Sequence, residues 1–151
     1  MKTIIAIDPG ANGGFSWNDV TGTRISCLPM PATEGDIIAL FTLLAHHRPT
    51  VVMEQVVGFI PGGGGGAMFS FGEGFGFLKG VAQALKMPLV LVRPQKWQKD
   101  LSLGTKKSYE KQWKNHLKER AQQLYPNCKV TLKTADSLLI LNWAMNYGQL
   151  V

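Results

Sequence analysis

Residues 2–10 read KTIIAIDPG, a short apolar run that ends on an acidic residue and is followed by the turn-forming pair Pro9-Gly10. Apolar runs of this length, bounded by turn residues, are typical of buried strands. Residues 50–56, TVVMEQV, repeat the pattern and bring a second acid, Glu54, near the end of a strand. If these two strands are parallel neighbours, Asp8 and Glu54 emerge at the same edge of the sheet, where open α/β sheets bind ligands.

The segments around these two strands predict the rest of the fold. We expect strands over residues 2–8, 13–18, 23–29, 50–56 and 88–93, and helices over residues 34–47, 68–86, 105–124 and 134–147. The first three strands follow one another closely, as in an antiparallel meander, and the later strands alternate with helices, as in parallel sheets. This order predicts an α/β fold with a mixed five-stranded sheet and helices on its faces. The last helix is apolar nearly all round, which predicts burial on more than one side.

Composition favours a single domain over residues 1–151. The hydrophobic content of 45% and the charged content of 17% exclude a disordered chain. No apolar run approaches the ~20 residues of a transmembrane helix, and the first residues lack the long apolar region of a signal peptide. Cys27 and Cys128 have no metal-ligand spacing and imply no disulfide framework. We expect a cytoplasmic, intracellular protein with no membrane partner.

Positive charge gathers in residues 93–133, which hold eleven basic and three acidic residues in a chain of net charge +6. Clustered basic residues are typical of proteins that bind polyanions, although basic helices also serve solubility. The predicted helix 105–124, with Thr105 as its N-cap, carries a lysine stripe at i, i+4, i+7 and i+11. The stripe comprises Lys107, Lys111, Lys114 and Lys118. It is either a contact for a DNA backbone or a solvated face, which the Glu110–Lys114 pair would partly support.

Three acids stand in apolar surroundings: Asp8, Glu54 and Asp136, the last followed by SLLILNWA. A carboxylate beside a buried run is costly unless it is hydrogen-bonded, paired or bound to a metal ion. Three converging carboxylates would suit Mg²⁺ or Mn²⁺, which prefer oxygen ligands. The alternatives are a turn-capping role for Asp8 and a favourable charge at a helix N-terminus for Asp136.

The ordered set IAIDPGANGG, VVMEQV, a lysine-rich segment and KTADSLLILNWA resembles the RuvC family of Holliday-junction resolvases, over essentially the whole chain. The resemblance implies an RNase H-like fold and hydrolysis of DNA phosphodiesters by two divalent metal ions, Mg²⁺ with Mn²⁺ as a substitute. It implies that Asp8, Glu54 and Asp136 are the catalytic metal ligands. The family's usual fourth ligand falls on Lys133, which cannot serve while protonated. Glu73 could substitute only if its helix brings it inward.

The resemblance also implies partners and binding residues. The substrate would be four-way junctions and other branched DNA, and the active form a homodimer that uses the helix at 68–86. Among lysines that the family needs, Lys107 matches one and Lys96 or Lys99 the other. The family's aromatic wedge position aligns with Val57, which makes Phe59 the best candidate for a junction wedge, with Met68 and Phe69 as alternatives.

Two other functions fit parts of the pattern. IDPGANGG also resembles the first phosphate motif of actin-like ATPases, although such proteins need two domains around the nucleotide. The glycine tract at 62–66 lacks the Lys-Ser or Lys-Thr of a phosphate-binding loop, so we expect no nucleotide cofactor. The departure at Lys133 keeps open a protein that binds branched DNA without cutting it. The tryptophans are expected in the core, with Trp97, between Lys96 and Lys99, as a possible base-stacking exception.

Overall fold

The computed structural model describes residues 1–56 and 64–148. The strands are β1 (Ile4–Asp8), β2 (Gly14–Asn18), β3 (Ile25–Pro29), β4 (Thr50–Glu54) and β5 (Leu89–Val92). The helices are α1 (Glu34–Leu44), α2 (Gly65–Ala84), α3 (Pro94–Asp100), α4 (Lys106–Tyr109), α5 (Trp113–Leu124) and α6 (Ala135–Asn146), with short 3-10 turns η1 (Ala45–His47) and η2 (Glu110–Gln112).

The five strands form one mixed sheet in the order β3-β2-β1-β4-β5. β1 pairs antiparallel with β2, which pairs antiparallel with β3, whereas β4 runs parallel to both β1 and β5. This arrangement confirms the predicted antiparallel meander followed by parallel strands. Ile7 lies opposite Met53 in the β1–β4 register, so Asp8 and Glu54 are the next residues along their strands and leave the sheet at the same edge.

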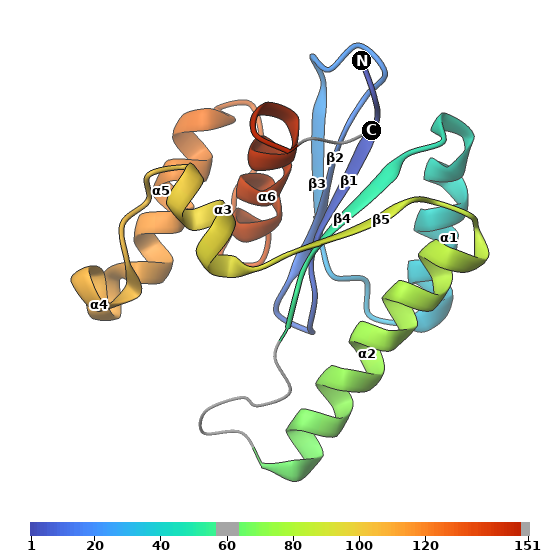
Figure 1. Ribbon diagram of the computed structural model, residues 1–151, viewed down its shortest axis with the longest axis horizontal. Coiled ribbons are helices and arrows are strands. Elements are labelled where there is room, and N and C mark those ends of the chain that lie inside the picture. The colour runs from blue at the N-terminus through green and yellow to red at the C-terminus, as the bar shows by residue number, and fades with distance from the viewer. Residues whose placement is uncertain (57–63, 149–151) are drawn as a thin grey trace.

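Each face of the sheet is covered by its own layer of helices. Because side chains alternate along a strand, Ile4, Ala6 and Val52 face α3, α5 and α6, whereas Ile5, Ile7 and Val51 face α1 and α2. Figure 1 shows the two helical layers on opposite sides of the sheet, with the N-terminal part of α2 extending beyond the strands. The helices on both faces confirm the predicted α/β architecture.

α6 is the central element of one layer, as its apolar sequence predicted. Eight of its side chains are buried, and the helix packs on β1, β2 and α5. Near its start, the hydroxyls of Ser137 and Ser16 form a buried hydrogen bond of 2.6 Å between α6 and β2. This bond fixes the first turn of α6 against the sheet.

The single helix predicted over 105–124 is wrong, because the chain breaks there into α4, η2 and α5. Glu110 adopts φ 51° at the break, a conformation that continues no helix. The Tyr109 ring stacks on His116 with the ring centroids 3.8 Å apart. In an unbroken helix, residues seven apart are separated by about 10 Å along the axis, so this stacking requires the break.

The break also corrects the predicted lysine stripe. Lys107 lies on α4, Lys111 on η2, and only Lys114 and Lys118 share α5. Thr105 does cap a helix as expected, because its hydroxyl oxygen accepts a hydrogen bond from the Ser108 backbone N–H, but that helix is α4. The four lysines therefore do not form one helical face.

α3 and the start of α2 also differ from the sequence-based expectation. α3, which the sequence did not predict, begins with Pro94 at its first turn, where proline's missing N–H costs nothing. α2 begins at Gly65 rather than at residue 68, so part of the glycine tract is helical.

No helix in the described ranges is long and apolar enough to cross a membrane.

Candidate active site

The carboxylates of Asp8, Glu54 and Asp136 meet at one edge of the sheet. Asp8 lies on the same face of β1 as Ala6, and Glu54 on the same face of β4 as Val52, so both point toward the layer that contains α6. Asp136 stands in the first turn of α6 and approaches from that layer. The fold therefore brings together three acids that are separated by 46 and 82 residues in the sequence.

Burial raises the pKa of all three acids, and the charges of neighbouring acids add to this at Asp8 and Glu54. Burial, followed by the charges of Asp136 and Glu54, raises the pKa of Asp8 well above its ordinary value. Burial and the charge of Asp136 raise the pKa of Glu54 to about 7. The pKa of Asp136 is also raised, chiefly by burial. The site thus concentrates negative charge in a place where water solvates it poorly, which favours a bound cation.

The indole of Trp97 is hydrogen-bonded to one carboxylate oxygen of Glu54. Its indole N–H donates a hydrogen bond of 2.9 Å to Oε2 of Glu54, and its side chain is 0% exposed. This bond lowers the pKa of Glu54 and opposes part of the effect of burial. Trp97 is therefore a buried residue that positions an acid, and it is not an exposed base-stacking platform. The short spacing from Pro94 to Trp97 was the only signal in the sequence that could have placed it on a helix.

Lys114 of α5 is the one cation whose charge reaches all three acids among the described residues. It lowers the pKa of Asp8, Glu54 and Asp136. Its side chain is exposed, so the charge lies at the mouth of the site. The sequence predicted Lys114 as a DNA contact, and the structure places it beside the acids.

The donor chemistry of the site fits a divalent cation such as Mg²⁺ or Mn²⁺, because all three side chains offer carboxylate oxygens. Within residues 1–56 and 64–148, however, no three His, Cys, Asp or Glu side chains stand in an arrangement that could hold a metal ion. One oxygen of Glu54 is already engaged by Trp97. Shared coordination of one ion would therefore use the other Glu54 oxygen and rotation of the aspartate side chains.

The two candidates for a fourth ligand are both exposed. Lys133 is exposed, and its backbone N–H donates to the Thr131 hydroxyl. Glu73 is exposed on α2 and lines a different groove, together with Gly10 and Asn12. In the described part of the chain, neither side chain is among the charges that shift the pKa of the three acids.

A basic groove lies between α3 and the α4–α5 region. It has a volume of about 740 Å³, and its lining includes Lys99, Lys106, Lys107 and the ring of Trp113. The groove has no acidic residue among its described lining, and Ser102 and Thr105 add hydroxyl groups. Lys106 was missed from the sequence because an unbroken helix would have placed it off the predicted stripe.

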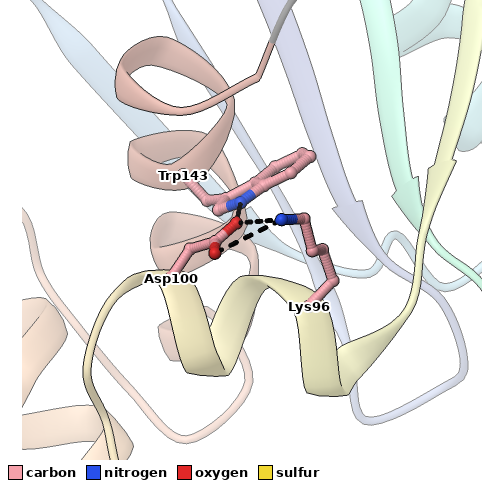
Figure 2. A network of polar contacts seen from close by, with 3 residues as sticks. All are labelled: Lys96, Asp100 and Trp143. Atoms are coloured by element: carbon pink, nitrogen blue, oxygen red, sulfur yellow. Dashed lines mark hydrogen bonds and ion pairs between the residues drawn. The ribbon is translucent and has the colours of Figure 1, made fainter.

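The other predicted lysines lie outside this groove. Lys96 forms an ion pair of 3.0 Å with Asp100, which also accepts a 2.7 Å hydrogen bond from the Trp143 indole (Figure 2). These partners lower the pKa of Asp100, with Trp143 as the larger cause. The Asp100–Trp143 bond joins α3 to α6, whereas the Lys96 ion pair lies within α3. Because Lys96 is engaged in this pair, Lys99 is the freer of the two alternatives. Lys111 and Lys118 lie beyond the groove lining, on η2 and α5.

The wedge candidates are only partly described. Phe59, together with Val57, falls outside the described residues. Met68 is half-buried on α2, whereas Phe69 is 71% exposed on the same helix. Trp113 and Trp143 are buried and Trp17 is half-buried, as expected for core tryptophans.

Comparison of the sequence with protein-family models and with curated proteins finds no match. Comparison of the structure does find similar folds. The structure of Thermus thermophilus RuvC in complex with a Holliday junction substrate superposes with a TM-score of 0.67 and 19% identity, covering 99% of this chain and 96% of that one. A second structure of Thermus thermophilus RuvC gives a TM-score of 0.60 and 16% identity, covering 97% and 96%. The chain has the RNase H-like fold of RuvC.

Proposed function

We propose that the protein is a divalent-metal-dependent endonuclease that cleaves four-way junctions and other branched DNA. The observation that carries the proposal is the convergence of Asp8, Glu54 and Asp136 at one edge of the sheet, in a fold shared with a protein solved on a Holliday junction. Buried acids with raised pKa values are rarely kept without a functional reason, because they destabilise the native chain. The basic groove nearby supplies the charge that a polyanionic substrate requires.

In this proposal the three acids hold Mg²⁺, or Mn²⁺ in its place. Bound there, the metal would activate a water molecule and stabilise the leaving oxygen of the phosphodiester. Asp8 comes from the central strand, and the charges of both other acids raise its pKa. It would therefore take the shared position, that of the metal ligand next to both of the others. Trp97 keeps Glu54 oriented, and Lys114 helps to keep the acids ionised near neutral pH.

The DNA backbone would follow the basic groove. Lys99, Lys106 and Lys107 line it without a competing carboxylate in the described lining. Phosphate contacts by lysine position a duplex without reading its sequence, which suits an enzyme that recognises the shape of a junction. Lys114 stands on α5, where its charge reaches the acids, and would contact the phosphate nearest to the reaction.

A homodimer completes the proposal, because paired cuts in a symmetric junction require two active sites related by a two-fold axis. α2 offers a suitable face. Gly72, Gly76 and Gly80 repeat every four residues, and a Cβ at any of them would meet nothing within 4 Å. Phe69 lies on the same side of the helix by helical spacing and is largely exposed.

Substitution of Asp8 tests the proposed activity. We expect wild type to place metal-dependent, paired nicks in a synthetic four-way junction and to spare a matched linear duplex. Asp8→Asn should reduce cleavage by roughly a thousandfold or more, because it removes a metal-binding charge at the shared position. Junction affinity should be unchanged or tighter, because one negative charge is lost beside the phosphates. Cleavage is measured on gels with Mg²⁺, Mn²⁺ or EDTA.

Asp36→Asn is the matched control, because Asp36 is exposed in the first turn of α1 and far in sequence from the three acids. It should cut like wild type. Normal turnover by Asp8→Asn would refute the proposed site. Tight junction binding by wild type, with no cleavage in either metal, would instead support a second candidate function, a protein that binds branched DNA without cutting it. Lys133 at the expected ligand position favours that candidate.

A further inference from the structure

The two cysteines lie side by side although 101 residues separate them in the sequence. Cys27 is opposite Ser16 in the β2–β3 register, and Ser16 bonds to α6. Directly opposed residues of an antiparallel pair point to the same face, so Cys27 points toward the layer that contains α6. Cys128, in the connection from α5 to α6, packs against the same core cluster.

Reciprocal contacts join the two cysteine segments. The Cys27 thiol donates to the Lys129 carbonyl at 3.9 Å, and the Cys128 thiol donates to the Ile25 carbonyl at 3.6 Å. Burial, followed by the neighbouring Cys27 thiol, raises the pKa of Cys128. Each sulfur therefore sits over the segment that carries the other, and both side chains are only half-buried. Reagents can therefore reach both thiols.

We propose that Cys27 and Cys128 form an oxidation site that closes into an intramolecular disulfide when the protein meets a small-molecule disulfide. One protein thiolate attacks the reagent RSSR, forms a mixed disulfide and releases one RS⁻. The second thiolate attacks the protein sulfur of that mixed disulfide, forms the Cys27–Cys128 bond and releases the other RS⁻. Two protein thiols are oxidised and one RSSR is reduced to two RSH. The proposal does not depend on the nuclease function.

The bond would join the edge strand β3 to the segment that leads into α6. That segment is otherwise held through local bonds such as Thr131 N–H to the Thr134 hydroxyl at 3.0 Å. A covalent link that closes a loop of about 100 residues restricts the unfolded chain strongly. Oxidation should therefore raise the Tm of the protein by about 5–15 °C.

The test exposes full-length wild-type protein to oxidised glutathione near pH 8.5 and follows its intact mass and free thiols. Wild type should lose both thiols without a covalent link between chains, lose about 2 Da per chain and retain no glutathione. Dithiothreitol should restore both the thiols and the original Tm. Cys27→Ser and Cys128→Ser should each trap one glutathione on the remaining cysteine. Conversion of the mixed disulfide into the intramolecular disulfide should be at least tenfold faster in folded protein than in guanidinium, because folding holds the thiols together.

Several results would overturn the site. Folded wild type could retain glutathione on both cysteines, or keep both thiols intact while the single variants react. A disulfide could instead form between two chains, or the intramolecular disulfide could close at equal rates in folded and denatured protein. The comparison of folded with denatured wild type needs no variant, so a misfolded serine substitution does not weaken the test. Failure of this site would leave the proposed nuclease untouched, because none of these readouts is cleavage.

Discussion

At the scale of single residues, the site lowers the stability of the folded chain because three carboxylates share one poorly solvated edge of the sheet. Burial is the largest cause of the raised pKa at each of them, and their mutual repulsion adds to it at Asp8 and Glu54. Two groups act in the opposite direction, the indole N–H of Trp97 on Glu54 and the charge of Lys114 on all three. The fraction of acids ionised near neutral pH therefore depends on residues that the sequence motifs do not include.

Lys114→Gln should shift the acidic limb of the pH–activity profile to higher pH. Removing the charge raises the pKa of the three acids, so a higher pH is needed to ionise them for metal binding. We expect a shift of about 0.5–1 pH unit, measured as junction cleavage at fixed Mg²⁺. Lys111→Gln removes an equal charge from η2 and should leave the profile in place. An unmoved profile in Lys114→Gln would contradict this role.

The stability of metal-free protein should depend on Glu54 in a defined pH window. The pKa of Glu54 is about 7 in the folded chain against an ordinary value of 4.5, so the folded state binds more protons between these values. The stabilisation is complete below pH 4.5 and is lost as the pH rises to 7, by on the order of 3 kcal/mol. Urea unfolding in EDTA measures it.

Glu54→Gln is the control for that window, because its amide oxygen can still accept the Trp97 bond but does not titrate. Relative to wild type, the variant should gain stability as the pH rises from 4.5 to 7. Asp8 and Asp136 have pKa shifts of the same direction and remain in both proteins. A constant difference between the two proteins across the window would show that Glu54 titrates normally.

At the scale of elements, α2 contains glycines that no close contact within the single chain requires. Each glycine inside a helix costs about 0.5–1 kcal/mol relative to alanine, yet Gly72, Gly76 and Gly80 face open space. Close approach of a second helix is the usual use of such a face. Gly76→Leu should therefore convert the proposed dimer to a monomer without lowering the Tm of the monomer, as measured by light scattering and thermal unfolding.

Gly74→Leu is matched to that change, because Gly74 lies on the same helix with equal free space but faces the opposite side by helical spacing. It should leave the dimer intact. Dissociation by both variants to the same extent would mean that α2 tolerates no bulk anywhere, and dissociation by neither would exclude the glycine face from the dimer.

The sequence predicted the elements whose signals are local. Apolar patterns predicted the strands KTIIAID and TVVME and the buried helix α6. The expected parallel pairing of the two strands predicted that Asp8 and Glu54 lie at the same edge of the sheet. The break at Glu110 could not be predicted, because the 3.6-residue period of apolar residues continues through it. The stacking of Tyr109 on His116 that accompanies the break is visible only in the folded structure. The pairing of Cys27 with Cys128 depends on tertiary packing alone.

At the scale of the whole molecule, α3, α4, α5 and α6 lie on one side of the sheet (Figure 1), and they carry Asp136 and most of the lining of the basic groove. Lys99→Ala and Lys107→Ala should each weaken junction binding, and each should reduce by about 1 the slope of log affinity against log salt concentration. Fluorescence anisotropy between about 50 and 200 mM salt measures both effects.

Arg24→Ala provides the comparison, because Arg24 is exposed in the β2–β3 hairpin, at the end of the sheet opposite the acids. It should change neither affinity nor slope by a comparable amount. An equal loss at Arg24 would mean that total charge, rather than the groove, governs binding.

The hydrogen bond between Ser16 and Ser137 joins the second strand to the last helix, and Asp136 is the neighbour of Ser137. During synthesis on the ribosome, Asp136 follows Glu54 by 82 residues, roughly 4–16 s at ordinary elongation rates. Until α6 has emerged and docked, Asp8 and Glu54 have no third partner, and the exposed β1 and β4 lack their cover. A nascent chain, or one truncated before α6, would therefore lack the complete acid site, and the proposed cleavage would begin only after α6 has docked.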